Sequence, residues 1–194
     1  GPLPFTSGPY YLGALVIMLF TLSVLQFSPP LRWALISVVL FCLLLSMGKH
    51  AEWLNRPLFD HLPMYSKFRA PNSIMNVMAL IVTIPALIGL QKWLKMPDKD
   101  AAIKRLYQAA GITGGLIILG LLMLSTADFT GPADGRYPET VREILINARK
   151  SVLKTDVLRS LAFVLLGGGL LWAYAKNILS SQNIMYASLG ALMV

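Results

Sequence analysis

Long apolar runs alternate with polar segments along this chain, and the runs have the length of membrane-crossing helices. A helix needs about 20 apolar residues to cross the hydrocarbon core of a bilayer. The runs that meet or approach this length, with a shorter one at the end, are 10–27, 31–47, 74–90, 106–126, 157–175 and 184–194. No strand pattern is visible between them. The pattern predicts an all-α fold, a polytopic transmembrane helix bundle of about five to six spans.

Proline and glycine mark particular points in these runs. Ser-Pro-Pro at 28–30 separates the first two runs by a very short connection. Pro85 predicts a kink in the third run, which neighbouring helices have to accommodate. Small residues let helix backbones approach closely in lipid, whereas phosphate-binding loops follow strands. We therefore expect helix-packing surfaces at Gly111, Gly115 and 167–169.

The connections between the runs differ in length and charge. The segment 91–105 is compact and basic. Because cytoplasmic loops carry an excess of Lys and Arg, we expect this segment in the cytoplasm and the long connections 48–73 and 127–156 on the outer side. The outer connections carry even more cations, so charge counting alone leaves the reverse orientation open. An anionic substrate would explain the positive charge on the outer side.

The second long connection contains a predicted amphipathic helix. Pro138 suits the first helical position and Glu139 the first turn. Apolar residues then recur at helical spacing, at Val141, Ile144, Leu145, Ala148, Val152 and Leu153. Polar residues occupy the opposite face. The pattern predicts an interfacial amphipathic helix that lies in the plane of the membrane surface and then runs toward the fifth span.

Composition supports lipid as the solvent. The chain of 194 residues is 56% hydrophobic and 13% charged, with a mean hydropathy of +0.63, whereas soluble domains are about 45–50% apolar and about 25% charged. The single cysteine, Cys42, excludes a disulfide framework and a thiol-based metal cluster. The net charge of +8 comes without any nucleic-acid-binding motif, so we expect membrane lipid and not nucleic acid as the partner.

The two ends of the sequence indicate part of a longer protein. The opening GPLPFTSGPYY has no basic region before the first apolar run, which is unlike a signal peptide. The last residues, NIMYASLGALMV, lie within an apolar run. A natural protein seldom ends inside a span, so we expect further chain on at least one side.

Polar groups in the outer connections are the candidates for chemistry, because the chain has no Walker, zinc or GxSxG motif. In MYSKFRAPN, Lys67 and Arg69 are spaced to clamp a phosphate, and Pro71 stiffens the segment. The alternative is that both cations reach lipid headgroups, with Tyr65 and Phe68 in the aromatic belt of the membrane.

The segment GKHAEWLNRPLFDHLP contributes a second set of polar residues. Asp60 or Glu52 is a candidate general base, assisted by His50 or His61, and Arg56 lies between them. The two histidines are eleven residues apart without a carboxylate at helical ligand spacing, so no metal site is expected. The alternative is that these are ordinary polar residues of an interfacial or re-entrant stretch.

Three further charged residues lie at the ends of the fourth and fifth spans. Asp156 and Arg159 are three residues apart on one helical face, either as a substrate-binding pair or as a helix-end ion pair. Asp128 follows the fourth span and leaves the same two alternatives open.

The stretch 43–73, LLLSMGKHAEWLNRPLFDHLPMYSKFRAPNS, resembles a pattern in the YfhO family of bacterial membrane proteins. A span there ends in a small residue, Gly and Lys, followed by an aromatic stretch and LP.Y.KFRAP. The matching positions are Ser46, Gly48, Lys49, Leu62, Pro63, Tyr65, Lys67, Phe68, Arg69, Ala70 and Pro71. The segments 6–15 and 155–160 are similar to flanking parts of the same pattern, in the same order.

The resemblance implies a GT-C-like fold in the bacterial inner membrane. It implies a glycosyltransferase that takes a sugar from a polyprenyl-phosphate carrier outside the cytoplasm, with no cofactor. Lys67, Arg69 and Lys49 are then the candidates that face the phosphate. The carboxylate on which such enzymes depend would lie in an early outer loop that precedes Gly1. His50 stands where the pattern has an asparagine, which departs from the family.

Two other functions stay open at this stage. A non-catalytic membrane subunit of a larger envelope or respiratory complex would use glycine-rich helix faces to dock protein partners. A transporter would place charged residues inside its spans. The apolar runs contain almost no charged residues away from their ends, which counts against transport.

Overall fold

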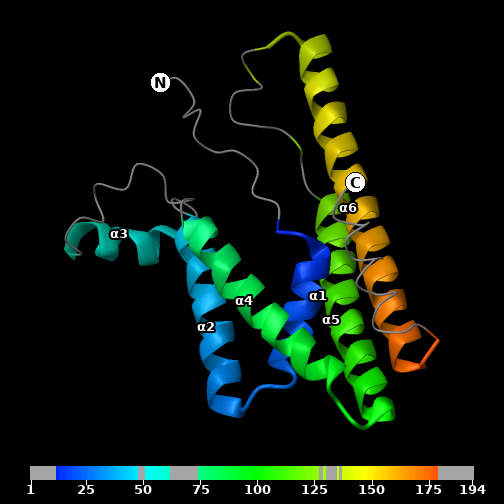
Figure 1. Cartoon of the computed structure of the whole chain (residues 1–194). Helices are drawn as coiled ribbons and strands as arrows, with labels where there is room; N and C mark the ends of the chain where they lie inside the picture. The colour runs from blue at the N-terminus through cyan, green and yellow to red at the C-terminus, as the bar shows by residue number, and fades with distance from the viewer. Residues whose placement is uncertain are drawn as a thin grey trace. The chain divides into compact units, whose positions relative to one another are not determined.

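The computed structural model describes residues 12–47, 51–61, 74–126, 129, 135 and 137–178. Apart from turns and short 3₁₀ segments, these residues form α-helices and contain no strand. The helices are α1 (Ala14–Val24), α2 (Pro29–Ser46), α3 (Glu52–His61), α4 (Ile74–Leu94), α5 (Lys99–Thr126) and α6 (Glu139–Ala175) (Figure 1). The predicted all-α class is confirmed.

Four of these helices are long and apolar enough to cross a membrane: α2, α4, α5 and α6. They contain the predicted runs that begin at residues 31, 74, 106 and 157. The first predicted run is only partly helical in the described residues, since α1 has 11 residues. The run 184–194 lies outside the described residues.

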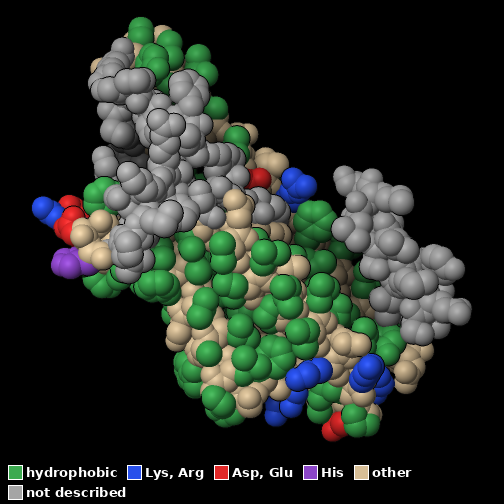
Figure 2. Space-filling model, turned by 60° about the vertical axis from the view of Figure 1, so that its left-hand side comes forward, with side chains coloured by type: hydrophobic (Ala, Val, Ile, Leu, Met, Phe, Trp, Pro, Cys, Tyr) green, Lys and Arg blue, Asp and Glu red, His purple; other side chains and the backbone are tan. Residues whose placement is uncertain are grey.

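The surfaces of the spanning helices are those of a protein solvated by lipid. Between 11% and 22% of the residues in each spanning window are buried. Leu80 in α4 and Leu166 in α6 are 62% and 66% exposed. Figure 2 shows hydrophobic side chains covering much of the visible surface. Such continuous apolar exposure would be unstable in water over this area, and a bilayer removes the cost.

The chain divides into two compact units, 1–95 and 96–194. In the first unit, α4 packs against α1 and α2, and α3 adjoins α2. One face of α4 is buried at helical spacing along its whole length. Its buried residues are Met78, Val82, Ala86, Gly89 and Trp93. Met78 and Val82 form a cluster with Cys42 of α2, so α4 is the centre of this unit.

Helices α1 and α4 approach each other most closely at Gly89. A Cβ atom at Gly89 would collide with the side chain and Cα of Ser23. Ser23 Oγ donates to the carbonyl of Leu19, 2.8 Å, and lies 3.4 Å from the carbonyl of Ala86. Gln26 Nε2 donates to the carbonyl of Gly89 at 3.2 Å. Because Gly89 has no side chain, the backbones of α1 and α4 can approach closely. The side chains of Ser23 and Gln26 then bridge the two helices, as polar side chains often do between helices in lipid.

Arg32 closes the turn between α1 and α2. Its Nε donates to the carbonyl of Val24 at 2.8 Å, and its Nη2 to those of Leu25 and Phe27 at 3.2 and 3.3 Å. The last carbonyls of a helix have no partner within the helix. A guanidinium with several donors in a fixed plane satisfies three acceptors at once and holds α2 against the end of α1.

In the second unit, α5 and α6 pack together as an antiparallel pair. Asp98 caps the start of α5, since its Oδ1 accepts the backbone N–H groups of Asp100 and Ala101 at 3.0 Å. The end of α6 is a Schellman motif: Asn177 has φ 59°, and Ile178 N–H donates to the carbonyl of Ala173 at 2.9 Å. Both helix ends are therefore defined by specific caps.

Within the described residues, no neighbour packs on the glycines of α5 and α6 that were expected to form packing surfaces. A Cβ atom added at Gly111, Gly115 or Gly169 would meet nothing within 4 Å. The buried stripe of α5 runs instead through Ala102, Leu106, Ala109 and Thr113. Gly111 and Gly115 lie on the other side of the helix from this stripe, because neither follows its three- and four-residue spacing.

Helix α6 continues through the predicted break between the interfacial helix and the fifth span. It has 37 residues without interruption, a length of about 55 Å at 1.5 Å per residue. No proline or glycine occurs between Glu139 and Leu166, so nothing in that stretch ends the helix. The hydrocarbon core is about 30 Å thick. The amphipathic stripe therefore belongs to a helical extension of the span and not to a separate helix.

Each unit has one end that matters below. In the first unit, the end of α2 and helix α3 lie together, and we call this end the α3 side. In the second unit, the start of α5 and the end of α6 lie together because the two helices are antiparallel, and we call this end the turn side.

Candidate functional site on helix α3

Helix α3 is a short polar helix that lies across the end of α2 (Figure 1). Ala51, just before it, is buried, and Leu54 and Leu58 are half-buried. Asn55 Nδ2 donates to the carbonyl of Ala51 at 3.2 Å and lies 3.5 Å from that of Leu44. These contacts attach α3 to the last turn of α2, at one end of a spanning helix.

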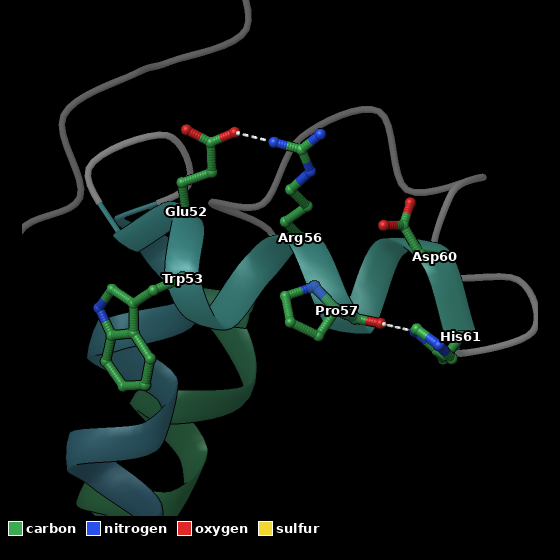
Figure 3. Close-up of a pocket in the computed structure, with 6 residues that line it drawn as sticks. All are labelled: Glu52, Trp53, Arg56, Pro57, Asp60 and His61. Atoms are coloured by element: carbon green, nitrogen blue, oxygen red, sulfur yellow. Dashed lines mark hydrogen bonds and ion pairs between the residues drawn. The ribbon is translucent and has the colours of Figure 1, made fainter.

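Two rows of side chains run along the exposed face of α3 (Figure 3). One row, four residues apart, is Glu52, Arg56 and Asp60, and the other is Trp53, Pro57 and His61. In Figure 3 the Trp53 ring lies beside α2, while Glu52, Arg56 and Asp60 point away from it. The Trp53 side of α3 therefore faces the level of the spanning helices, and the charged row faces away.

This arrangement is that of a helix at a membrane surface. Trp53 is 70% exposed although it is large and apolar. Tryptophan is enriched at the boundary between hydrocarbon and water, where its ring meets lipid and its N–H meets the headgroups. The predicted interfacial character of this stretch thus agrees with the geometry, and it is a helix, not an irregular loop.

The six residues of the two rows line a hollow of about 500 Å³. All of them belong to one helix, so the hollow is an open surface feature and not a cleft between elements. Glu52 Oε1 and Arg56 Nη1 are 3.4 Å apart, with side chains 68% and 73% exposed. An exposed pair of this kind contributes at most about 1 kcal/mol. Arg56 is consequently available to exchange Glu52 for another anion.

His61 is held by the end of its own helix. Its Nδ1 lies 3.0 Å from the carbonyl of Pro57. A carbonyl only accepts, so this hydrogen bond requires the proton on Nδ1, and Nε2 is then the unprotonated nitrogen of the neutral ring. Asp60 is exposed beside it. The helix presents one imidazole nitrogen and one carboxylate to solvent, both as acceptors.

The described part of α3 supplies a binding surface more readily than a catalytic centre. Its charged groups are solvated, and a high local dielectric weakens the electrostatic effects on which catalysis depends. Among the residues that the structure describes, no three His, Cys, Asp or Glu side chains are grouped to hold a metal ion. The surface suits a polar headgroup presented at the membrane boundary.

The remaining predicted site residues are distributed as follows. Those outside the described residues are Lys49, His50, Tyr65, Lys67, Arg69 and Asp128. Asp156 and Arg159 lie in α6, in the other unit. The guanidinium of Arg159 lies 5.7 Å from the centre of the Phe163 ring. The pairing of Asp156 with Arg159 stays a prediction from the sequence.

Sequence reasoning did not single out two of the residues that organise the first unit. Arg32 was visible as a cation two residues after the break at 28–30, and in the fold its side chain reaches back to the end of the preceding helix. Gly89 was visible as an isolated glycine in an apolar run, which predicts close helix packing. The other glycines in apolar runs give the same prediction, so Gly89 did not stand out.

Comparisons with known proteins add no relative. No family model matches the chain, and neither a curated protein nor a solved structure matches it. The likeness of residues 43–73 to the YfhO pattern therefore stays a prediction from sequence.

Proposed function

We propose that the chain is the membrane part of a glycosyltransferase that uses a polyprenyl-phosphate-linked sugar on the extracytoplasmic face of the bacterial inner membrane. The observation that carries the proposal is the placement of α3. This helix sits at the end of a spanning helix, with its charged row away from the span. A lipid-linked donor presents its phosphate at the same level, because its polyprenyl chain stays in the hydrocarbon.

The segment that follows α3 supports the same function. Its sequence contains Lys67 and Arg69 within twelve residues of a helix whose own cation, Arg56, is weakly paired. Cations close to a leaving phosphate stabilise the charge that develops on it. The α3 side is then the extracytoplasmic side. Co-linearity with the YfhO pattern across residues 43–73 adds the expectation of a GT-C-like fold.

The chemistry assigns a separate role to each type of group. The acceptor hydroxyl attacks the anomeric carbon, the bond from that carbon to the phosphate oxygen breaks, and the phosphate leaves with the electron pair. A general base removes the hydroxyl proton. Lys67 and Arg69 neutralise the departing phosphate, with Arg69 suited to a two-point contact through its planar fork. The resemblance assigns the base to a carboxylate of an early outer loop, and the residues named here supply binding and charge stabilisation.

Substitution of the cations in the full-length protein tests the proposal. Arg69→Ala and Lys67→Ala should each abolish sugar transfer without reducing expression, whereas Arg69→Lys should retain part of it because the charge remains. Arg142→Ala, which removes a cation from the outer part of α6, is the matched control and should transfer sugar normally. Normal transfer by Arg69→Ala and Lys67→Ala would exclude both residues from the site.

A second function is favoured by the open glycine face of α5. Gly111 and Gly115, one turn apart, have no neighbour within 4 Å of a Cβ position. Such a face allows another helix to approach closely in lipid, as in a non-catalytic subunit of a membrane complex. Purification from native membranes separates the two functions. A stable stoichiometric partner indicates the subunit, and co-purified polyprenyl phosphate detected by mass spectrometry indicates the transferase.

A further inference from the structure

Cationic side chains gather where the α5–α6 pair ends on the turn side. Lys99 and Lys104 belong to the first turns of α5, and Lys176 follows the last residue of α6. The Lys99 ammonium lies 4.8 Å from the centre of the Tyr174 ring, which brings the two helix ends together. With Arg105, these are the cations at this end of the α5–α6 pair, and we call them the basic patch: Lys99, Lys104, Arg105 and Lys176.

The basic patch has no internal neutralisation. Its nearby carboxylates are Asp98 and Asp100. Asp98 is engaged in capping α5 through two backbone N–H groups. Asp100 is four residues before Lys104, the spacing of a helical ion pair, yet within the described part of the chain the two do not pair. The cations of the patch therefore carry uncompensated positive charge.

The patch lies at the level of lipid headgroups. Lys104 and Arg105 directly precede the apolar part of α5, and their long side chains reach outward from the hydrocarbon boundary. Tyr107, one turn further, is 61% exposed, as is typical of the aromatic belt. An anion that binds here with acyl chains attached also covers the exposed apolar surface of α5. A free anion gains only the charge interaction, which salt screens.

We propose that the basic patch binds the headgroups of anionic phospholipids, and that it fixes the turn side of the protein against the leaflet in which those lipids are concentrated. The ligand is the headgroup phosphate of a lipid with its acyl chains along α5 and α6. The proposal needs only the α5–α6 pair and holds for a transferase and for a membrane subunit alike.

Native mass spectrometry of the purified protein in a neutral detergent measures this binding directly. Phosphatidylglycerol and phosphatidylcholine with identical acyl chains are titrated separately. The test variant carries Lys104→Gln, Arg105→Gln and Lys176→Gln. The control variant carries Arg142→Gln, Lys150→Gln and Lys154→Gln, which remove the same charge from the other end of α6. A charge-conserving variant, with Lys104→Arg, Arg105→Lys and Lys176→Arg, accompanies them.

The wild type should bind phosphatidylglycerol more tightly than phosphatidylcholine. Each Lys or Arg near an anionic surface contributes about a factor of five in affinity, which is about 1 kcal/mol. The test variant should therefore lose affinity for phosphatidylglycerol by on the order of 100-fold and keep its affinity for phosphatidylcholine. The control and charge-conserving variants should bind both lipids as the wild type does.

Three results would overturn the proposal. One is a test variant that binds phosphatidylglycerol as tightly as the wild type. Another is an equal loss in the control variant, which would show that overall charge and not the patch attracts the lipid. The third is displacement of phosphatidylglycerol by inorganic phosphate beyond the effect of chloride at equal ionic strength, which would identify a site for a soluble anion. Unchanged binding of phosphatidylcholine, with unchanged circular dichroism, shows that the variants are folded.

Discussion

Replacement of Gly89 by alanine tests the contact on which the first unit depends. The new methyl group would collide with the side chain of Ser23 and with its Cα. The side chain of Ser23 can rotate, but its Cα cannot move without displacing α1. We therefore expect Gly89→Ala to push α1 and α4 apart and to destabilise the protein.

The size of the effect follows from the contacts that are lost. Inserting an extra methyl group into a packed interface costs about 1–3 kcal/mol. Separation of the helices also weakens the hydrogen bond from Gln26 to Gly89 and the longer contact from Ser23 to Ala86, 3.2 and 3.4 Å. Hydrogen bonds between membrane helices average about 0.6 kcal/mol each. The free energy of unfolding should fall by roughly 2–4 kcal/mol in total.

Unfolding by sodium dodecyl sulfate in mixed micelles, followed by circular dichroism, provides the free energies. Gly111→Ala is the matched control, because the same methyl group there meets nothing within 4 Å. Alanine has the higher helix propensity by about 1 kcal/mol, so the control should be as stable as the wild type or slightly more stable. Adding Ser23→Gly to Gly89→Ala should recover part of the loss by removing the nearest colliding atoms.

Equal stability of the Gly89→Ala and Gly111→Ala variants would refute the reasoning. It would mean that the α1–α4 contact either does not form in the membrane or yields without cost. Failure of Ser23→Gly to improve the Gly89→Ala variant would place the strain at a contact other than the one described.

Two caps lead to further predictions. Arg32→Met should lower the free energy of unfolding by about 2 kcal/mol, because three carbonyls at the end of α1 lose a charged donor. Hydrogen exchange at the backbone of α1 should become faster in Arg32→Met, and less so in Arg32→Lys. Unchanged exchange would show that water replaces the guanidinium. Asp98→Ala should lower the free energy of unfolding by about 1 kcal/mol in the same unfolding assay. Asp98→Asn should keep the stability of the wild type, because an amide oxygen accepts the same N–H groups. Equal losses of stability in both variants would attribute the effect to charge.

The helical architecture could be predicted because lipid imposes a simple rule. Every backbone polar group in hydrocarbon needs an internal partner, so a long apolar run has to be a helix. The runs beginning at residues 31, 74 and 106 therefore correspond to α2, α4 and α5 with shifted ends. The ends shift because polar residues such as Gln91, Lys92 and Lys104 continue a helix into the headgroup region. A boundary drawn where the apolar run ends leaves these residues out of the helix.

The continuity of α6 was harder to predict for a related reason. The change from polar to apolar near Thr155 resembles a boundary between two elements, but helices end at caps or at breaking residues. Asp156 and Arg159 are ordinary helical residues and supply neither. The composition changed because the surroundings of the helix change there, from headgroups and water to hydrocarbon.

Packing partners could not be read from composition at all. Gly89 and Gly111 look alike in sequence, since each is a glycine within an apolar run. Only the fold brings Ser23 against the first and leaves the second open. For α3, the four-residue spacing of Glu52, Arg56 and Asp60 places them on one face only when the segment is a helix, which was not predicted from its sequence. The position of that face relative to α2 depends on Asn55, which carried no signal of its own.

The unbroken length of α6 has a mechanical consequence. At 1.5 Å per residue, its 37 residues exceed the hydrocarbon core by roughly 25 Å. A continuous helix behaves as a stiff lever, so a tilt of about 10° within the bilayer displaces its first residues near Glu139 sideways by about 4 Å at this 1.5 Å rise. Because bilayer thickness influences helix tilt, a change of thickness would shift the positions of Glu139 and Arg142 outside the membrane.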